Sequence, residues 1–282
     1  MAVGVLGAST APPLIAACAA PGLAIAFWRT GAAAAVLAPV LLAREKRLTV
    51  PRGRGLWLAL AAGLALALHF GTFIPSLSYT SVASSAALVC TQPIWAGVIG
   101  WLLGERLPGR AWAGVGVCLL GVLAITGVDF TVSGDALLGD GLAVAGGVFG
   151  GFYIVIGGFA RRHLSTLDYT FVCYGTCAVW LAAVCLAGGV ALGGYAGEDW
   201  LRIAGVTVFG QLIGHSLFNL VLRSISPTMV ALGGLFTVPL AAIIAAVALG
   251  ETPPAAAIPA MVLLVAGTAL VISARARAAA AS

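Results

Sequence analysis

Long apolar stretches alternate with short polar breaks along the whole chain. The apolar runs between Pro, Gly and charged residues give ten candidate helices, at residues 3–20, 23–43, 56–76, 81–103, 110–127, 138–159, 168–187, 203–222, 228–249 and 255–274. Each run is close to the ~20 apolar residues that cross the hydrocarbon core of a bilayer. The pattern therefore predicts an all-α membrane protein with ten transmembrane helices.

Composition supports a chain that lies in lipid. Hydrophobic residues make up 61% of the sequence and charged residues 8%, whereas soluble proteins carry roughly 25% charged residues. The net charge of +5 comes from residues in the polar breaks, so we expect the lipid bilayer, and not nucleic acid, as the partner. The six Cys lie in apolar runs without a CxxC motif, which predicts neither disulfides nor a metal site.

The distribution of charge predicts the orientation in the membrane. With the N-terminus in the cytoplasm, all the basic residues except Arg29 and Arg202 fall on the inner side, as the positive-inside rule requires. The outer breaks are instead acidic, with Asp129, Asp135, Glu198 and Asp199. We therefore predict a multi-pass protein of the cell membrane with both termini cytoplasmic.

The second half of the chain repeats the first. A shift of 146 residues, the separation of His69 and His215, also aligns Thr91 with Thr237, Pro93 with Pro239 and Glu105 with Glu251. The repeat predicts two related halves, at residues 1–130 and 137–277. Each holds five helices, an odd number, so the second half enters the membrane upside down. Inverted repeats of this kind are typical of secondary transporters, with the substrate site near the midplane.

Several motifs give the repeat a family resemblance. Phe27-Trp28-Arg29 lies in the second helix, and Thr-x-Pro followed by Leu-Gly-Glu-x-x-Pro occurs in the fourth and ninth helices. Together these motifs resemble the EamA family of the drug/metabolite transporter superfamily. The resemblance implies a ten-helix carrier in the cell membrane, commonly an exporter of amino acids or other small metabolites, that works by alternating access. The second half departs from the pattern, because Gly175 stands where Arg29 is expected to recur.

Three ionisable residues within the predicted spans are candidates for the substrate site. His69 and His215 fall near the midplane, where an ionisable residue suggests a function. They would line a cavity or handle protons, or else simply form hydrogen bonds between helices. Arg29 lies toward the outer face. It would either extend its side chain to the interface or bind a substrate carboxylate through its guanidinium.

Other polar and aromatic residues extend the predicted cavity. Pro93 and Pro239 would kink their helices, because proline removes a backbone hydrogen bond, and Thr91 and Thr237 lie two residues before each kink. The kinks would border the cavity or only shape the packing. The remaining candidates within the spans are Gln92, Trp95, Tyr153, Gln211 and Asn219.

Glu105 and Glu251 each end a helix that is followed by proline. A carboxylate is unfavourable at a helix C-terminus and favourable at an N-terminus. We therefore expect both to approach the start of the next helix in a structural role. Proton coupling is the alternative interpretation.

The sequence contains no GxSxG, HExxH, Walker A or EF-hand motif, so we predict neither an enzyme nor a bound cofactor. The expected function is secondary transport, with export the expected direction, of small polar metabolites such as amino acids across the plasma membrane. Proton coupling is open at this point, as is the oligomeric state. The alternatives are a non-transporting membrane subunit and a passive channel.

Overall fold

The protein is helical throughout the part that its structure, a computed structural model, describes, namely residues 2–45, 53–104, 107–221 and 234–280. The helices of the first half are α1 (Ala2–Ala16), α2 (Gly22–Glu45), α3 (Arg54–Ser76), α4 (Val82–Val89), α5 (Gln92–Leu102) and α6 (Gly109–Val132). Those of the second half are α7 (Gly134–Ala160), α8 (Thr166–Ala187), α9 (Gly197–Gly205), the π-helix η1 (Val206–His215), α10 (Ser216–Val221), α12 (Thr237–Leu249) and α13 (Ala257–Ala280).

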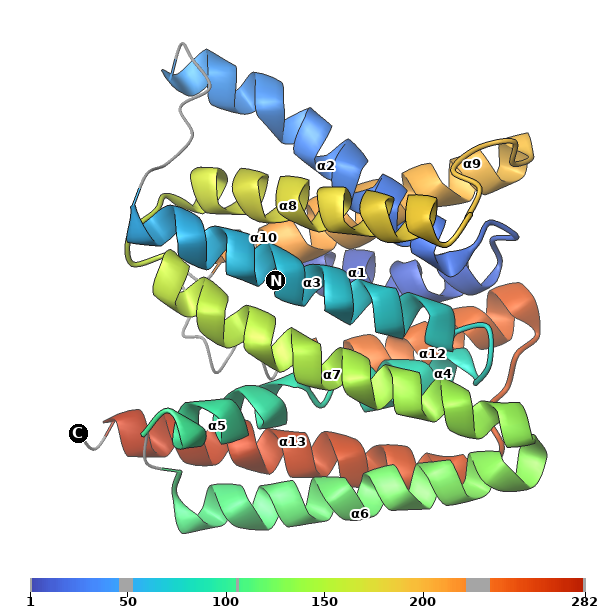
Figure 1. Ribbon diagram of the computed structural model, residues 1–282. Helices are drawn as coiled ribbons and strands as arrows, with labels where there is room; N and C mark the ends of the chain where they lie inside the picture. The colour runs from blue at the N-terminus through green and yellow to red at the C-terminus, as the bar shows by residue number, and fades with distance from the viewer. Residues whose placement is uncertain (1, 46–52, 105–106, 222–233, 281–282) are drawn as a thin grey trace.

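The helices agree with the predicted spans. Within the described residues, eight helical segments are long and apolar enough to cross a membrane, and Ala2–Ala16 and Thr237–Leu249 are two shorter apolar helices. The all-α membrane fold is therefore confirmed in outline. Figure 1 shows the helices side by side in a bundle, with α6 and α13 along one edge and α2 beyond α8 on the other side.

Both predicted proline kinks lie at helix starts. The fourth span is broken after Val89, and α5 restarts at Gln92 with Pro93 in its first turn. In the second half, α12 begins at Thr237 and Pro239 is its third residue. Proline is tolerated in the first turn, because the N–H groups there have no partner within the helix. The expectation of two prolines in mid-helix is therefore corrected to two equivalent helix starts.

Helices of the two halves pack in matching pairs. The second helix of each half meets its counterpart in the contact of α2 with α8, the fourth in that of α4 with α12, and the fifth in that of α6 with α13. The contact of α3 with α7 corresponds to that of η1 with α1. Each half therefore buries its helices mainly against the other half.

Two glycines at repeat-related positions allow α6 and α13 to approach closely. A Cβ atom on Gly121 would lie 2.8 Å from the backbone nitrogen of Leu264, and a Cβ atom on Gly267 would lie 2.5 Å from that of Cys118. Cys118 and Leu264 are themselves separated by the repeat shift. The same close contact is thus made twice, once from each half.

The acidic residues predicted in outer loops lie in helices. Asp129 is within α6 and only 3% exposed. Asp135 lies in the first turn of α7, where the Ser133 hydroxyl accepts a hydrogen bond from its backbone N–H. Glu198 and Asp199 lie in the first turn of α9, so the eighth span begins at Gly197 and not at residue 203. Acidic side chains in a first turn stabilise the positive end of the helix dipole, which extends these helices beyond their apolar runs.

Candidate functional site

A cavity of about 490 Å³ lies within the bundle, bordered by both halves. This volume falls in the range of small-molecule sites, roughly 300–1,000 Å³. Its described walls come from α1 to α5, α7, α8, η1, α10 and α12, whereas the α6–α13 pair contributes none of them. The cavity therefore lies on the side of the bundle away from that pair.

Arg29 is the buried one of the two arginines in the described lining of this cavity. Its side chain is 2% exposed, and its Nε and Nη2 atoms donate to Oε1 of the buried Gln211 at 3.1 and 2.8 Å. The guanidinium also lies 4.2 Å above the centre of the Phe70 ring, a favourable cation–π contact. Arg29 therefore does not extend to the interface: Gln211 and Phe70 hold it in the cavity wall.

His69 and His215 both line the cavity, in different environments. His69 is 4% exposed, and its Nδ1 atom lies 2.7 Å from the carbonyl oxygen of Gly146 on α7. A carbonyl only accepts, so this nitrogen carries the proton. The His215 ring lies perpendicular to the Phe70 ring, with 6.1 Å between their centres, and within the described chain it makes no hydrogen bond. Phe70 thus contacts both Arg29 and His215.

The π-helix η1 brings Gln211 and His215 to the site. Its ten residues follow α9 without a break, and π-helical geometry is often found at functional sites. Glycines let η1 pack closely on α1: a Cβ atom on Gly7 would lie 2.7 Å from the carbonyl oxygen of Phe209, and one on Gly214 would lie 3.1 Å from the Ala8 backbone. The wider helix and the close α1 contact together form one wall of the cavity.

The break between α4 and α5 supplies the polar residues of another wall. Gln92 and Pro93 line the cavity, and Gly150 leaves room for Gln92, because a Cβ atom there would lie 2.5 Å from its Cδ atom. Thr91 is 2% exposed and accepts a hydrogen bond of 3.0 Å from Trp95 Nε1. Thr91 and Trp95 are outside the cavity lining and support the break from behind.

The remaining candidates divide into four groups. Tyr153 and Thr237 line the cavity, whereas Gln211 acts from behind Arg29. Pro239 does not contribute to the described lining. The side chain of Asn219 and the whole of Glu105 lie outside the described residues.

Glu251 has a different partner from the one predicted. Its Oε1 atom accepts a hydrogen bond of 2.5 Å from the backbone N–H of Val82, the first residue of α4. The expected partner was the start of α13. A helix N-terminus does hold the carboxylate, as its positive dipole end favours, but this helix belongs to the first half. Glu251 therefore connects the two halves.

Several residues of the cavity were not predicted from the sequence. Phe70, Phe73 and Phe218 add aromatic surface, and Tyr169 and Arg161 lie at the end where α7 meets α8. Arg161 was interpreted only as a charge that sets the orientation. A phenylalanine in an apolar run carries no signal of its own, although Phe70 follows His69 directly. The described lining includes two arginines and no acidic residue, so its formal charge is positive.

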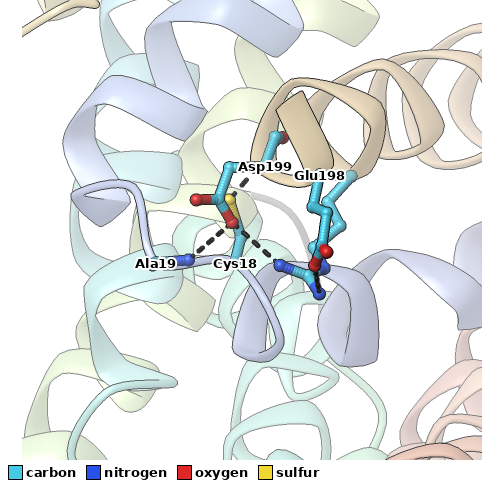
Figure 2. Close-up of polar contacts among 5 residues, drawn as sticks. Cys18, Ala19, Glu198 and Asp199 are labelled. Atoms are coloured by element: carbon cyan, nitrogen blue, oxygen red, sulfur yellow. Dashed lines mark hydrogen bonds and ion pairs between the residues drawn. The ribbon is translucent and has the colours of Figure 1, made fainter. Parts of the chain in front are cut away.

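A separate polar cluster joins α9 to the connection between α1 and α2 (Figure 2). Asp199 Oδ1 accepts hydrogen bonds from the backbone N–H of Ala19 at 3.0 Å and from Arg202 at 2.9 Å. Glu198 pairs with the same guanidinium at 3.0 Å. Asp199 is thus neutralised where it is buried. Within the described chain, no group of three or more His, Cys, Asp or Glu residues is placed to hold a metal ion.

These features define a multi-pass helical membrane protein with a solute-sized cavity among its helices. The sequence model of the EamA-like transporter family matches the chain twice, over residues 1–127 and 137–273. The chain belongs to this family, and so to the membrane transporters of the drug/metabolite transporter superfamily.

Comparison with solved structures supports the helical fold. One solved structure, titled only "Crystal structure of protein", superposes on this chain with a TM-score of 0.67 at 20% sequence identity. The match covers 96% of this chain and 94% of the solved chain. At that identity the likeness concerns the fold alone. No curated protein matches the chain significantly.

Proposed function

We propose that this protein is a secondary transporter that exports small polar metabolites such as amino acids across the plasma membrane by alternating access. The observation that carries the proposal is the buried Arg29, held by Gln211 in the wall of a cavity bordered by both halves. A guanidinium binds carboxylates well, because it offers paired N–H donors in a fixed plane. An organic carboxylate is therefore the substrate group that this cavity suits best.

The composition of the cavity supports a solute that is not purely polar. Besides Arg29 and Gln92, its wall includes Phe70, Phe73 and Tyr153. Aromatic walls with a few polar groups favour solutes that have both an apolar part and an ionised end. Amino acids with an apolar side chain combine these two properties.

The arrangement of the halves supports alternating access. The matching helix pairs, such as α2 with α8 and α6 with α13, are those that a twofold axis in the membrane plane would relate. Five helices in each half require opposite orientations, as in inverted-repeat carriers. Rocking of one half against the other would expose a cavity between them to each side in turn.

The extent of the cavity supports loading from inside. It reaches from Arg29 to Arg161 and Tyr169, at the end where α7 meets α8. In the predicted orientation, with both termini cytoplasmic, this end of the cavity faces the cytoplasm. An exported solute binds from that side. The basic Arg161 at that end would attract a carboxylate.

Solute flux in proteoliposomes tests the proposal. Purified protein is reconstituted, the vesicles are loaded with one unlabelled amino acid at a time, and uptake of the same labelled amino acid is followed. We expect saturable counterflow for at least one amino acid, reduced in Arg29→Gln. A non-transporting subunit would give no flux, and a passive channel would give flux without saturation or counterflow.

A further inference from the structure

Two buried carboxyl groups meet at the end of the bundle opposite Arg161. Asp129 lies in the last turn of α6 and Asp140 in the second turn of α7, and they are 3% and 1% exposed. Both carboxyl groups lie close to one hydroxyl group, that of Thr80. The Thr80 hydroxyl, from the connection between α3 and α4, lies 3.2 Å from Asp129 Oδ2 and 2.9 Å from Asp140 Oδ1.

The two carboxyl groups need more hydrogen-bond donors than the Thr80 hydroxyl supplies. Thr80 has one O–H hydrogen and cannot donate it fully to both carboxyl groups. Asp140 Oδ2 is buried without a hydrogen-bond partner in the described chain. A carboxyl oxygen left in this way is costly, and a proton on one of the two acids would supply the missing donor.

The charges around the pair do not neutralise it. The described ion pairs are those of Arg202 with Glu198 and Asp199, so none involves Asp129 or Asp140. Nearby, Tyr79 is 44% exposed, Asp135 is exposed in the first turn of α7, and Glu251 is bonded to α4. The helices packed against the pair carry arginines only at the ends away from it, within the described residues. These arginines are Arg54, Arg110, Arg161, Arg275 and Arg277. Asp129 also lies at the negative end of the α6 dipole, which disfavours a second charge.

We propose that Asp129 and Asp140 share one exchangeable proton and form a proton-binding site that holds α6, α7 and the α3–α4 connection together. With the proton bound, one carboxyl group donates to the other, and Thr80 bonds across both. When the proton leaves, two carboxylates face each other in a buried site and repel. Because Thr80 joins the helix pair to α3 and α4, loss of the proton loosens this end of the bundle.

A role for this proton in transport rests on the proposed function. By the predicted orientation, the pair lies at the outer end, and the cavity reaches the inner one. A proton taken from outside would close the outer end, and its release would favour opening there. The site would then make the opening of the outer end depend on whether its proton is bound.

Thermal unfolding of the purified full-length protein tests the site without any substrate. The unfolding midpoint is measured in mildly acidic and mildly alkaline buffer for wild type, Asp129→Asn and Asp140→Asn. Asparagine keeps the shape of the protonated acid and supplies N–H donors. We expect the wild-type midpoint to fall as pH rises, and most of that fall to disappear in both variants. Asp135→Asn, an exposed change of equal charge on α7, is the matched control and should fall like wild type.

Infrared spectroscopy gives a second measurement that does not depend on unfolding. Difference spectra between the two buffers should contain the C=O band of a protonated carboxyl group in wild type and Asp135→Asn. The band should be lost or shifted in Asp140→Asn. An unchanged band and an unchanged pH dependence in both pair variants would overturn the proposal. So would a wild-type midpoint that responds to sodium and not to pH, since that marks a cation site.

The two proposals fail in different ways. If the band and the midpoints behave as expected but no solute shows flux, the proton site stands and the transport proposal fails. If flux is seen and Asp140→Asn leaves its pH dependence unchanged, transport stands and the coupling role of the pair fails.

Discussion

Helices α3 and η1 hold equivalent places in the two halves, and their differences locate the site. Each carries a cavity-lining histidine at the same repeat position, His69 or His215. However, α3 is an α-helix, and its histidine is hydrogen-bonded to Gly146 of α7. In contrast, η1 is a π-helix, and its histidine packs perpendicular to the Phe70 ring without a hydrogen bond in the described chain. Helices at related positions thus make matching contacts, whereas the surroundings of the two histidines differ.

Arg29 is the sharpest departure, since its counterpart is Gly175. Arginine binds the η1 residue Gln211, so the first half supplies the charge and the second half positions it. The two halves therefore contribute unequally to one site.

Replacement of Arg29 should have the largest effect. Hydrogen bonds to charged groups contribute about 1.5–3 kcal/mol, so Arg29→Gln should lower counterflow of a carboxylate solute roughly ten- to hundredfold. Arg29→Lys keeps the charge and loses the planar pair of donors. Flux is measured per unit of reconstituted protein. Full activity in Arg29→Lys would contradict recognition by the guanidinium plane, and full activity in both would remove Arg29 from the site.

A substitution in the close contact between η1 and α1 should have the second largest effect on stability and flux. A methyl group on Gly7 would lie 2.7 Å from the Phe209 carbonyl oxygen, and overpacking of this kind costs about 1–3 kcal/mol. Gly7→Ala should therefore lower the unfolding midpoint and solute flux together. The control is Gly116→Ala on α6, where an added Cβ atom meets nothing within 4 Å. Equal midpoints in the two variants would show that η1 does not depend on this contact.

The two histidines should respond differently to the same change. His69→Ala removes the bond to Gly146 and should cost about 1 kcal/mol of stability. His215→Ala breaks no described hydrogen bond, so it should lower flux severalfold and leave the unfolding midpoint nearly unchanged. Both quantities are measured on the same purified samples. Wild-type flux in both variants would exclude the histidines from the transport path.

Glu251 should show the smallest effect. Its carboxylate stabilises the N-terminus of α4 across the two halves, and such interactions contribute about 0.3–1 kcal/mol. Glu251→Gln should lower the unfolding midpoint slightly. Glu198→Gln, which alters a carboxylate whose side chain is 78% exposed, is the comparison. An unchanged unfolding midpoint in Glu251→Gln would mean that the Glu251 contact is not stabilising.

Much of the fold could be predicted because hydrophobic length and the repeat both appear directly in the sequence. The matching prolines mark related places in the two halves, although they were expected in mid-helix and lie at helix starts. The pairing of like helices was not predicted. Helix ends were predicted less well: Ser133 and the acids of α7 and α9 extend helices into segments that polarity marks as loops.

The site could be predicted only in part. Arg29, His69 and His215 are conspicuous because ionisable residues are rare in apolar runs. Gln211 was named, but its role behind Arg29 depends on the π-helix, for which no sequence pattern was available. Asp140 was overlooked, since one acid near a helix start looks ordinary until Asp129 and Thr80 are seen beside it.

The central claim is that the cavity around Arg29 carries a carboxylate-bearing solute across the membrane. Counterflow of radiolabelled amino acids, compared between proteoliposomes of wild type and Arg29→Gln, tests it most directly. We expect saturable counterflow for at least one amino acid in wild type and a roughly tenfold or greater loss in the variant. Uptake equal to that of protein-free liposomes for every amino acid, or equal saturable uptake in both proteins, would contradict it.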